Sequence, residues 1–416
     1  MTKVVVVGLG YVGLPLAMRA ATVGHSVTGF DVDTRRVKLL EAGESYIEDI
    51  PSAELQGIRD LLEPTTRVGP LAHADAVLLC VPTPLTVNRE PDLGPLVDAT
   101  QALTRVLRAG QLVVLESTSY PGTTRERLLP MLEESGLAAG SDFSLAFSPE
   151  RVDPGREDFT IRTTPKVVGG LTEVCTQRAV DLYSLICDEI VPVGTPEAAE
   201  LTKLLENIFR SVNIALVNEL AILADRMKID IWEVVDAAST KPFGFMRFEP
   251  GPGMGGHCLP VDPFYLAWRA REFDFPTEFI ELAGKVNMQM PYHCVEKIER
   301  ALNDTGKAVK GARIAILGVS YKAGIGDVRE SPALKIIRLL AERGADLVYH
   351  DPHVPDIGAH GLRSLPLDEA LDSADLAVIV TAHPEIDLGM VINSAPRVVD
   401  LRGVTRRTPA PTVERL

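Results

Sequence analysis

The chain has 416 residues, 46% of them hydrophobic and 24% charged, with a formal net charge of −15 at pH 7. This length predicts two or three domains of an ordinary globular protein. The acidic balance excludes broad nucleic-acid binding, and no apolar run reaches the ~18 residues of a membrane span. Five scattered cysteines without a C-x-x-C pair favour a reducing cytoplasm over a disulfide framework or a zinc site. We therefore expect a cytoplasmic protein without nucleic-acid, membrane or metal partners.

The first third of the chain alternates predicted strands and helices. Residues 3–8, KVVVVG, form the continuous β-branched run that a strand buried on both faces requires. Further strands are predicted at 25–31, 76–81 and 112–117, with amphipathic segments between them. Such alternation predicts a parallel, doubly wound sheet.

A dinucleotide fingerprint, GLGYVG at residues 8–13, follows the first predicted strand and opens a predicted helix. In the G-x-G-x-x-G pattern Gly8 allows a tight turn, Gly10 lets the backbone approach a pyrophosphate, and Gly13 permits close packing of helix on strand. The next strand ends at Asp31, near the expected position of an acid that binds the ribose hydroxyls. The acid favours NAD, although the nearby Arg35 and Arg36 leave NADP open.

A long helix is predicted to start at Thr195 and Pro196, which suit a helix cap and first turn. From there to about residue 228 the chain has no further Gly or Pro, and a helix would span about 50 Å. It would connect two α/β units and offer a dimer surface; two shorter helices with a bend fit the same residues. Lys203 and Asn207 lie four residues apart on one face, where they could hold a developing alkoxide or oxyanion.

The C-terminal third predicts a second α/β domain. After a helical block at about 262–304, residues 312–324 restart strand, glycine turn and helix, and strands follow at 345–351, 374–381 and 396–402. We interpret the final PAPTVERL as a frayed tail. The predicted fold is α/β, with two Rossmann-like doubly wound domains joined by a long central helix and boundaries at 194/195 and 305/306.

The segment 251–263, GPGMGGHCLPVDP, suits neither helix nor strand. It presents the thiol of Cys258 in a glycine loop, where loop dipoles or His257 could lower its pKa. A buried cysteine is usually an inert small hydrophobe, as we expect of the others, Cys80, Cys175, Cys187 and Cys294. A nucleophilic thiol beside a dinucleotide domain predicts oxidation of an alcohol through an aldehyde and a thioester to an acid.

Several motifs together resemble the nucleotide-sugar 6-dehydrogenases, which oxidise C6 of a UDP-sugar to a carboxylate with two NAD. They cover nearly the whole chain: VVVGLGYVGLPLA, VPTPLTVNREPDL, ESTSYPGTT, FSPERVDPG, AELTKLLENIFRSVNIALVNE, GPGMGGHCLPVDP and YKAGIGDVRESPA. The resemblance implies an N-terminal NAD domain (1–194), a central helical dimerisation and catalytic region (195–305) and a C-terminal UDP-binding domain (306–416). It also implies a homodimer or a higher homo-oligomer.

The resemblance assigns roles to residues of these motifs. It implies Cys258 as nucleophile, Lys203 and Asn207 as stabilisers of alkoxide and oxyanion, Asp262 and Thr118 in water and proton transfer, and Glu150 in thioester hydrolysis. Implied cofactor contacts are Gly8, Gly10, Tyr11, Val12, Gly13, Asp31, Arg36, Pro82, Thr83, Thr118 and Arg329. Implied substrate contacts are Glu150, Arg151, Lys203, Asn207, Arg247, Gly255, Lys322 and Arg402.

The branch of the family rests on the residues around the cysteine. The GGHC and VDP runs resemble the N-acetylhexosamine enzymes, since Val261 stands where UDP-glucose enzymes more often have a lysine. FPTEFIELAGKVNMQMP is similar to the UDP-N-acetylglucosamine 6-dehydrogenases. UDP-glucose or dTDP-glucose stays open as substrate. So do two other classes: a two-electron hydroxy-acid dehydrogenase, and a nucleotide-binding regulator without catalysis.

Overall fold

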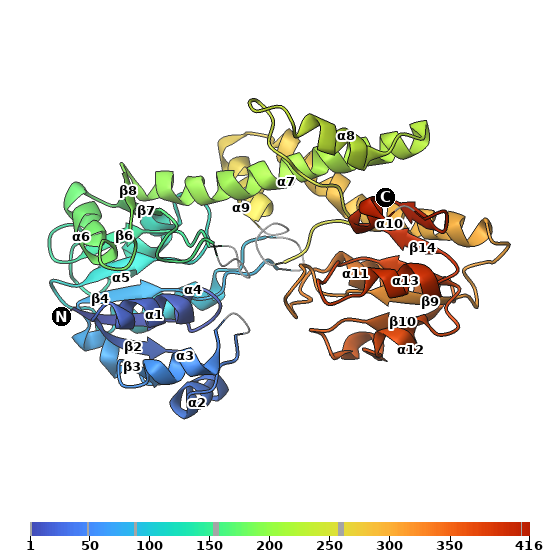
Figure 1. Ribbon diagram of the computed structural model, residues 1–416. Coiled ribbons are helices and arrows are strands. Elements are labelled where there is room, and N and C mark those ends of the chain that lie inside the picture. The colour runs from blue at the N-terminus through green and yellow to red at the C-terminus, as the bar shows by residue number, and fades with distance from the viewer. Residues whose placement is uncertain (1, 48–49, 87–89, 153–157, 257–261, 409) are drawn as a thin grey trace. The chain divides into compact units, whose positions relative to one another are not determined.

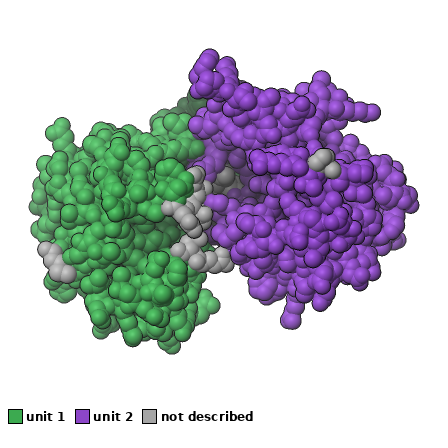
Figure 2. Space-filling view, in the orientation of Figure 1, with its two compact units in different colours: residues 1–206, 264–276 green, residues 207–263, 277–416 purple. Residues whose placement is uncertain are grey.

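The structure is a computed structural model that describes the chain except residues 1, 48–49, 87–89, 153–157, 257–261 and 409. The chain divides into two compact units (Figure 2). Unit 1 comprises residues 1–206 and 264–276, and unit 2 comprises residues 207–263 and 277–416. The three-part division predicted from the sequence stays a prediction.

Unit 1 is built on a sheet with strand order β3-β2-β1-β4-β5-β6-β7-β8 (Figure 1). Its strands are parallel except for the pair β6 and β7. The strands are β1 (Lys3–Val7), β2 (Ser26–Phe30), β3 (Leu62–Thr65), β4 (Ala76–Leu79), β5 (Leu112–Leu115), β6 (Ser144–Phe147), β7 (Lys166–Gly170) and β8 (Ile190–Val193). The helices are α1 (Gly13–Thr22), α2 (Thr34–Ala42), α3 (Ser52–Gly57), α4 (Gly94–Thr104), α5 (Leu129–Glu133) and α6 (Glu173–Tyr183).

The first strand shows why the sheet is buried on both faces. Val4 and Val6 belong to one apolar cluster, whereas Val5 and Val7 belong to another. Successive side chains of a strand point to opposite faces, so the run of valines supplies both cores. The sheet predicted from this run is confirmed.

Unit 2 contains a second, wholly parallel sheet with strand order β10-β9-β13-β14-β15. Its strands are β9 (Arg313–Leu317), β10 (Asp346–His350), β13 (Leu376–Ile379), β14 (Val398–Asp400) and β15 (Val413–Arg415), with a small pair β11 (Asp356–Ile357) and β12 (Leu362–Arg363). Its helices are α8 (Ile231–Ala238), α10 (Glu278–Asn303), α11 (Pro332–Glu342), α12 (Leu367–Leu371) and α13 (Leu388–Ser394). The two Rossmann-like sheets confirm the predicted fold class.

The prediction that the C-terminal tail is frayed is wrong. Val413 pairs with Val398 as β15 joins the edge of the sheet, and Leu416 is only 5% exposed. Arg415 also forms an ion pair with Asp230 at 2.8 Å. Three strand residues after two prolines are too short a run to predict as a strand, because the sheet edge and core that bind them are distant in sequence.

The central helix is confirmed as a single element, α7 (Pro196–Met227), so the alternative of two shorter helices is wrong (Figure 1). The helical block after it is divided into α9 (Asp262–Ala270) and α10, and Asp274 between them has a positive φ of 55°. By length and composition α7 could cross a membrane. This is weak evidence for a membrane span, because the helix carries buried polar residues that are costly in lipid: Glu200, Lys203 and Asn207.

Candidate active site

The glycine turn GLGYVG joins β1 to α1 in unit 1. Gly8 has φ +91°, and a Cβ there would lie 2.7 Å from the Cys80 carbonyl oxygen. A Cβ on Gly13 would lie 1.8 Å from the Gly8 oxygen, whereas one on Gly10 would meet nothing within 4 Å. The turn therefore needs Gly8 and Gly13 for its own packing and leaves open space at Gly10. This open backbone at a helix N-terminus fits a pyrophosphate; contacts by Tyr11 and Val12 stay predictions.

Asp31 follows β2 directly and is buried beside this turn. Its Oδ2 accepts the Leu9 N–H at 2.8 Å and a bond from Arg36 at 3.2 Å, while its Oδ1 accepts the Asp33 N–H. A carboxylate has about four lone-pair sites, so Oδ1 keeps one for a ribose hydroxyl. Arg36 is held by the acid itself, which supports NAD at this edge.

The segment 118–124 lies next to the turn after β4. Thr83 donates its hydroxyl to the Thr118 carbonyl at 2.7 Å, and Pro82 precedes it in the same turn. Glu200 of α7 holds the far end of the segment: its carboxylate accepts the N–H groups of Gly122 and Thr124 at 2.6 and 2.8 Å. Sequence reasoning missed Glu200, although it lies one turn before Lys203 on the same helix.

Glu150 lies after β6, where its Oε1 accepts the backbone N–H groups of Arg151 and Val152 at 2.7 and 2.6 Å. Behind it, the ammonium of Lys166 lies 3.8 Å from Glu150 and 2.6 Å from buried Glu116. Burial opposes the charge of Lys166, but the carboxylates of Glu116 and Glu150 together outweigh this effect and hold the pKa of Lys166 above its usual value. Sequence reasoning missed this buried pair.

Arg151, predicted to contact substrate, is already engaged in unit 1. Its guanidinium forms an ion pair with Glu206 of α7 at 2.6 Å and donates to the Pro165 carbonyl. Its position beside Glu150 is compatible with a substrate contact, which stays a prediction.

Both predicted catalytic residues of α7 lie on its buried face: Lys203 is 9% exposed and Asn207 is 7% exposed. In unit 2, the Asn207 amide donates to the carboxylate of Asp262, the first residue of α9. Asp262 is 1% exposed. The structure thus brings together two predicted catalytic residues that are 55 positions apart in the chain.

Cys258 lies outside the described residues, as do His257 and Val261, so their roles stay predictions. The described glycines before Cys258 are packed tightly. A Cβ on Gly255 would lie 2.6 Å from the side chain of Tyr321, and one on Gly251 would lie 2.7 Å from the Arg402 guanidinium. The other four cysteines are buried and free, as predicted.

A pair of buried asparagines anchors the start of this loop. Asn218 of α7 accepts the Gly251 N–H at 2.9 Å and donates to Asn287 of α10 at 2.9 Å. Asn287 in turn donates to the Ser211 carbonyl at 3.1 Å. Asn218 lies about three turns after Asn207, so the spacing could have placed it on the same face of α7, although not with its distant partners.

The remaining predicted ligand contacts lie on loops of unit 2. Arg329 pairs with Asp327 at 2.6 Å. Arg247 pairs with Asp236 at 2.7 Å and with Glu249 at 2.8 Å. Arg247 is therefore part of a local ion-pair cluster, and its contact with substrate stays a prediction.

Three segments of the chain match one family in order. Residues 2–187 match the NAD binding domain of the UDP-glucose/GDP-mannose dehydrogenase family, residues 197–289 its central domain, and residues 315–407 its UDP binding domain. The chain is 37% identical to the UDP-N-acetyl-D-glucosamine 6-dehydrogenase of Pseudomonas aeruginosa, over 92% of this chain and 91% of that protein.

Solved structures agree with these matches. The UDP-D-ManNAc dehydrogenase of Pyrococcus horikoshii superposes with a TM-score of 0.91 at 32% identity, covering 99% of this chain and 98% of that one. The UDP-glucose dehydrogenase of Pyrobaculum islandicum gives a TM-score of 0.88 at 30% identity, covering 100% and 97%.

Fold and glycine turn together define an NAD-dependent oxidoreductase with two Rossmann-like domains. The chain belongs to the UDP-glucose/GDP-mannose dehydrogenase family and is a nucleotide-sugar 6-dehydrogenase. The names of its relatives include three different sugars, so they do not select one.

Proposed function

We propose that the protein oxidises the C6 hydroxymethyl group of UDP-N-acetylglucosamine to a carboxylate, a four-electron reaction that proceeds through covalent intermediates on Cys258. The observation that carries the proposal is the hydrogen bond between buried Asn207 and buried Asp262. It joins the predicted oxyanion face of α7 to the first described residue after the cysteine segment.

In this reaction NAD, when bound, accepts one hydride in each of two oxidations. The Lys203 ammonium and Asn207 amide stabilise the negative oxygen that develops at C6. The Cys258 thiolate adds to the aldehyde carbon and gives a thiohemiacetal. Loss of a hydride from that carbon gives a thioester, and water then releases the acid and regenerates the thiol. Glu150, Thr118 and Asp262 hold and orient the water and its protons.

The choice of sugar rests on the segment after α9, whose residues resemble the N-acetylglucosamine enzymes, and on the similarity to the Pseudomonas aeruginosa relative. To test it, the enzyme is given NAD with UDP-N-acetylglucosamine, UDP-N-acetylmannosamine, UDP-glucose or dTDP-glucose, and NADH is counted per sugar. We expect two NADH per acid, with the highest kcat/KM for UDP-N-acetylglucosamine. Preference for another sugar would reassign the substrate.

The covalent step is tested with Cys258→Ser, which should stall after the first oxidation. Complete double oxidation by this variant would refute the thioester route. One NADH per turnover in the wild type, with no effect of Cys258→Ser, would favour a two-electron dehydrogenase. Binding of NAD without turnover of any sugar nucleotide would favour a regulator.

We also propose a homodimer formed along α7. The helix exposes apolar side chains three, four or seven residues apart, as a helix seam does: Leu201, Leu205, Phe209, Leu216, Leu220, Leu223 and Met227. A second copy of the same helix would cover this stripe by two-fold symmetry. The stripe also explains why α7 is apolar enough to satisfy a membrane-span criterion.

A further inference from the structure

The two Rossmann-like sheets begin with the same backbone turn. In unit 1 the Gly8 N–H donates to the Phe30 carbonyl at 2.8 Å, and in unit 2 the Gly318 N–H donates to the His350 carbonyl at 2.9 Å. An acid follows in each case. Asp351 accepts the Val319 N–H at 2.7 Å, as Asp31 accepts that of Leu9. Asp351 therefore occupies the position that binds ribose in a dinucleotide domain.

Unlike Asp31, Asp351 has no acceptor capacity left. Its Oδ1 accepts the N–H groups of His353 and Val354, and its Oδ2 accepts those of Val319 and Ser320. His383 lies 3.1 Å from Oδ2 as a fifth partner, and both side chains are fully buried. A carboxylate has about four lone-pair sites, so no ribose hydroxyl can bind here.

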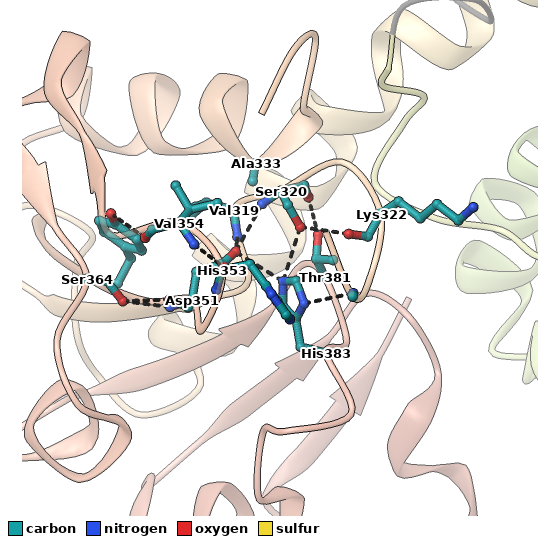
Figure 3. A network of polar contacts seen from close by, with 12 residues as sticks. Val319, Ser320, Lys322, Ala333, Asp351, His353, Val354, Ser364, Thr381 and His383 are labelled. Atoms are coloured by element: carbon teal, nitrogen blue, oxygen red, sulfur yellow. Dashed lines mark hydrogen bonds and ion pairs between the residues drawn. The ribbon is translucent and has the colours of Figure 1, made fainter. Parts of the chain in front are cut away.

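His383 instead holds the turn that follows β9 (Figure 3). Its Nδ1 accepts the Gly324 N–H at 3.1 Å, so Nε2 carries the proton and can donate to Asp351 and to the Ser320 hydroxyl. Ser320 then donates to the Lys322 carbonyl at 2.8 Å. The imidazole thus fixes the turn directly at Gly324 and through Ser320 at Lys322, while the Lys322 side chain runs out of the network (Figure 3).

We infer that His383 is a positioning residue for the nucleotide sugar, because it fixes the backbone from which Lys322 reaches the substrate. The inference rests on the proposed function in one respect, the substrate contact of Lys322. In this network Asp351 accepts hydrogen bonds from the turn rather than from a ribose, which suits the UDP binding domain that the family assigns to this region.

A metal at His383 is the competing interpretation, because His353, His383 and Glu385 bring ligand atoms within 4.8 Å of one another. Both ring nitrogens of His383 already have partners, however. A metal on His383 would have to displace either Gly324 or the Asp351 and Ser320 contacts. The network as it stands therefore favours the positioning role.

The test measures UDP and NAD binding to the full-length protein by calorimetry. His383→Phe keeps an aromatic ring and removes the contacts with Gly324, Asp351 and Ser320, so UDP should bind about tenfold more weakly while NAD binding is unchanged. His383→Asn restores an acceptor near Gly324 and should stay within about threefold of wild type. The matched control is His350→Phe, which loses one bond to Leu365 in the same unit but none to the turn.

Three results would overturn the inference: wild-type UDP affinity in His383→Phe, parallel loss of UDP and NAD binding, or loss of UDP binding on dialysis against EDTA. If His383→Phe does not fold, Ser320→Ala is measured in its place. Wild-type UDP affinity in Ser320→Ala would also overturn the inference. In turnover, KM for the sugar nucleotide should rise while kcat stays within about threefold. UDP binding without any NADH production would instead refute the proposed function alone.

Discussion

Replacing Gly10 by alanine should weaken NAD binding without unfolding the protein. A Cβ at Gly10 meets no atom within 4 Å, and its φ lies outside the left-handed region. We therefore expect a change of no more than ~1 kcal/mol in the free energy of unfolding. With NAD bound, the methyl group would occupy the space that the pyrophosphate needs. An intruding methyl group costs about 1–3 kcal/mol, which weakens NAD binding about 5- to 150-fold.

Calorimetry with NAD and thermal unfolding of the free protein measure the two quantities separately. Gly57→Ala is the matched control, since a Cβ there also meets nothing within 4 Å and Gly57 ends α3, outside the glycine turn. Gly8→Ala is the contrast: φ +91° and the 2.7 Å approach to Cys80 should disrupt the fold itself. Wild-type NAD affinity in Gly10→Ala would refute the assignment of this turn to the pyrophosphate.

Three further predictions concern α7. Burial raises the pKa of Glu200 to about 7, against the hydrogen bonds from Thr124 and Gly122. The folded state then keeps a proton that the unfolded chain releases, so the free energy of unfolding should fall by ~3 kcal/mol as pH rises from about 4.5 to 7. In urea titrations at several pH values, the free energy of unfolding of Glu200→Gln should not show this decrease. The same pH dependence in Glu200→Gln and the wild type would contradict the reasoning. Asn218→Ala leaves the Gly251 N–H without its partner, so it should cost about 1–3 kcal/mol of stability and most of the turnover. Half-buried Asn213 on the same helix is the control, and a fully active Asn218→Ala variant would exclude the anchor. Leu220→Glu should be monomeric in light scattering, whereas Glu219→Ala should remain dimeric. Dimers in both variants would show that the interface does not lie along this stripe of α7.

The elements that the sequence predicted well have local signals. Each of these elements has a periodicity or spacing that can be seen in a short stretch of sequence. The examples are the valine runs, the G-x-G-x-x-G turn and the Gly-free stretch after Pro196. Lys203 and Asn207 were predictable for the same reason, because four residues on a helix place both on one face, and the structure buries that face.

The features that the sequence could not predict depend on contacts across long separations. Glu200 caps Gly122 from 78 positions away, and Asn218 meets Asn287 from 69 positions away. The final strand failed as a prediction for the same reason, since β15 is stabilised by the edge of β14 rather than by its own three residues. Polar residues in such roles look like ordinary surface residues until their partners are known.

The two halves of the protein show how one backbone frame can serve two ligands. RIAILG and KVVVVG lead to turns with the same glycine and acid contacts, so the frame alone does not select a ligand. Asp31 keeps an acceptor site for ribose, whereas His383 and four backbone N–H groups occupy Asp351. The two turns therefore differ in whether the carboxylate that follows them still has a lone pair free to accept a hydrogen bond from a ligand. It follows that removing His383 should loosen the second turn without creating a second NAD site, because the four N–H groups still fill the acid.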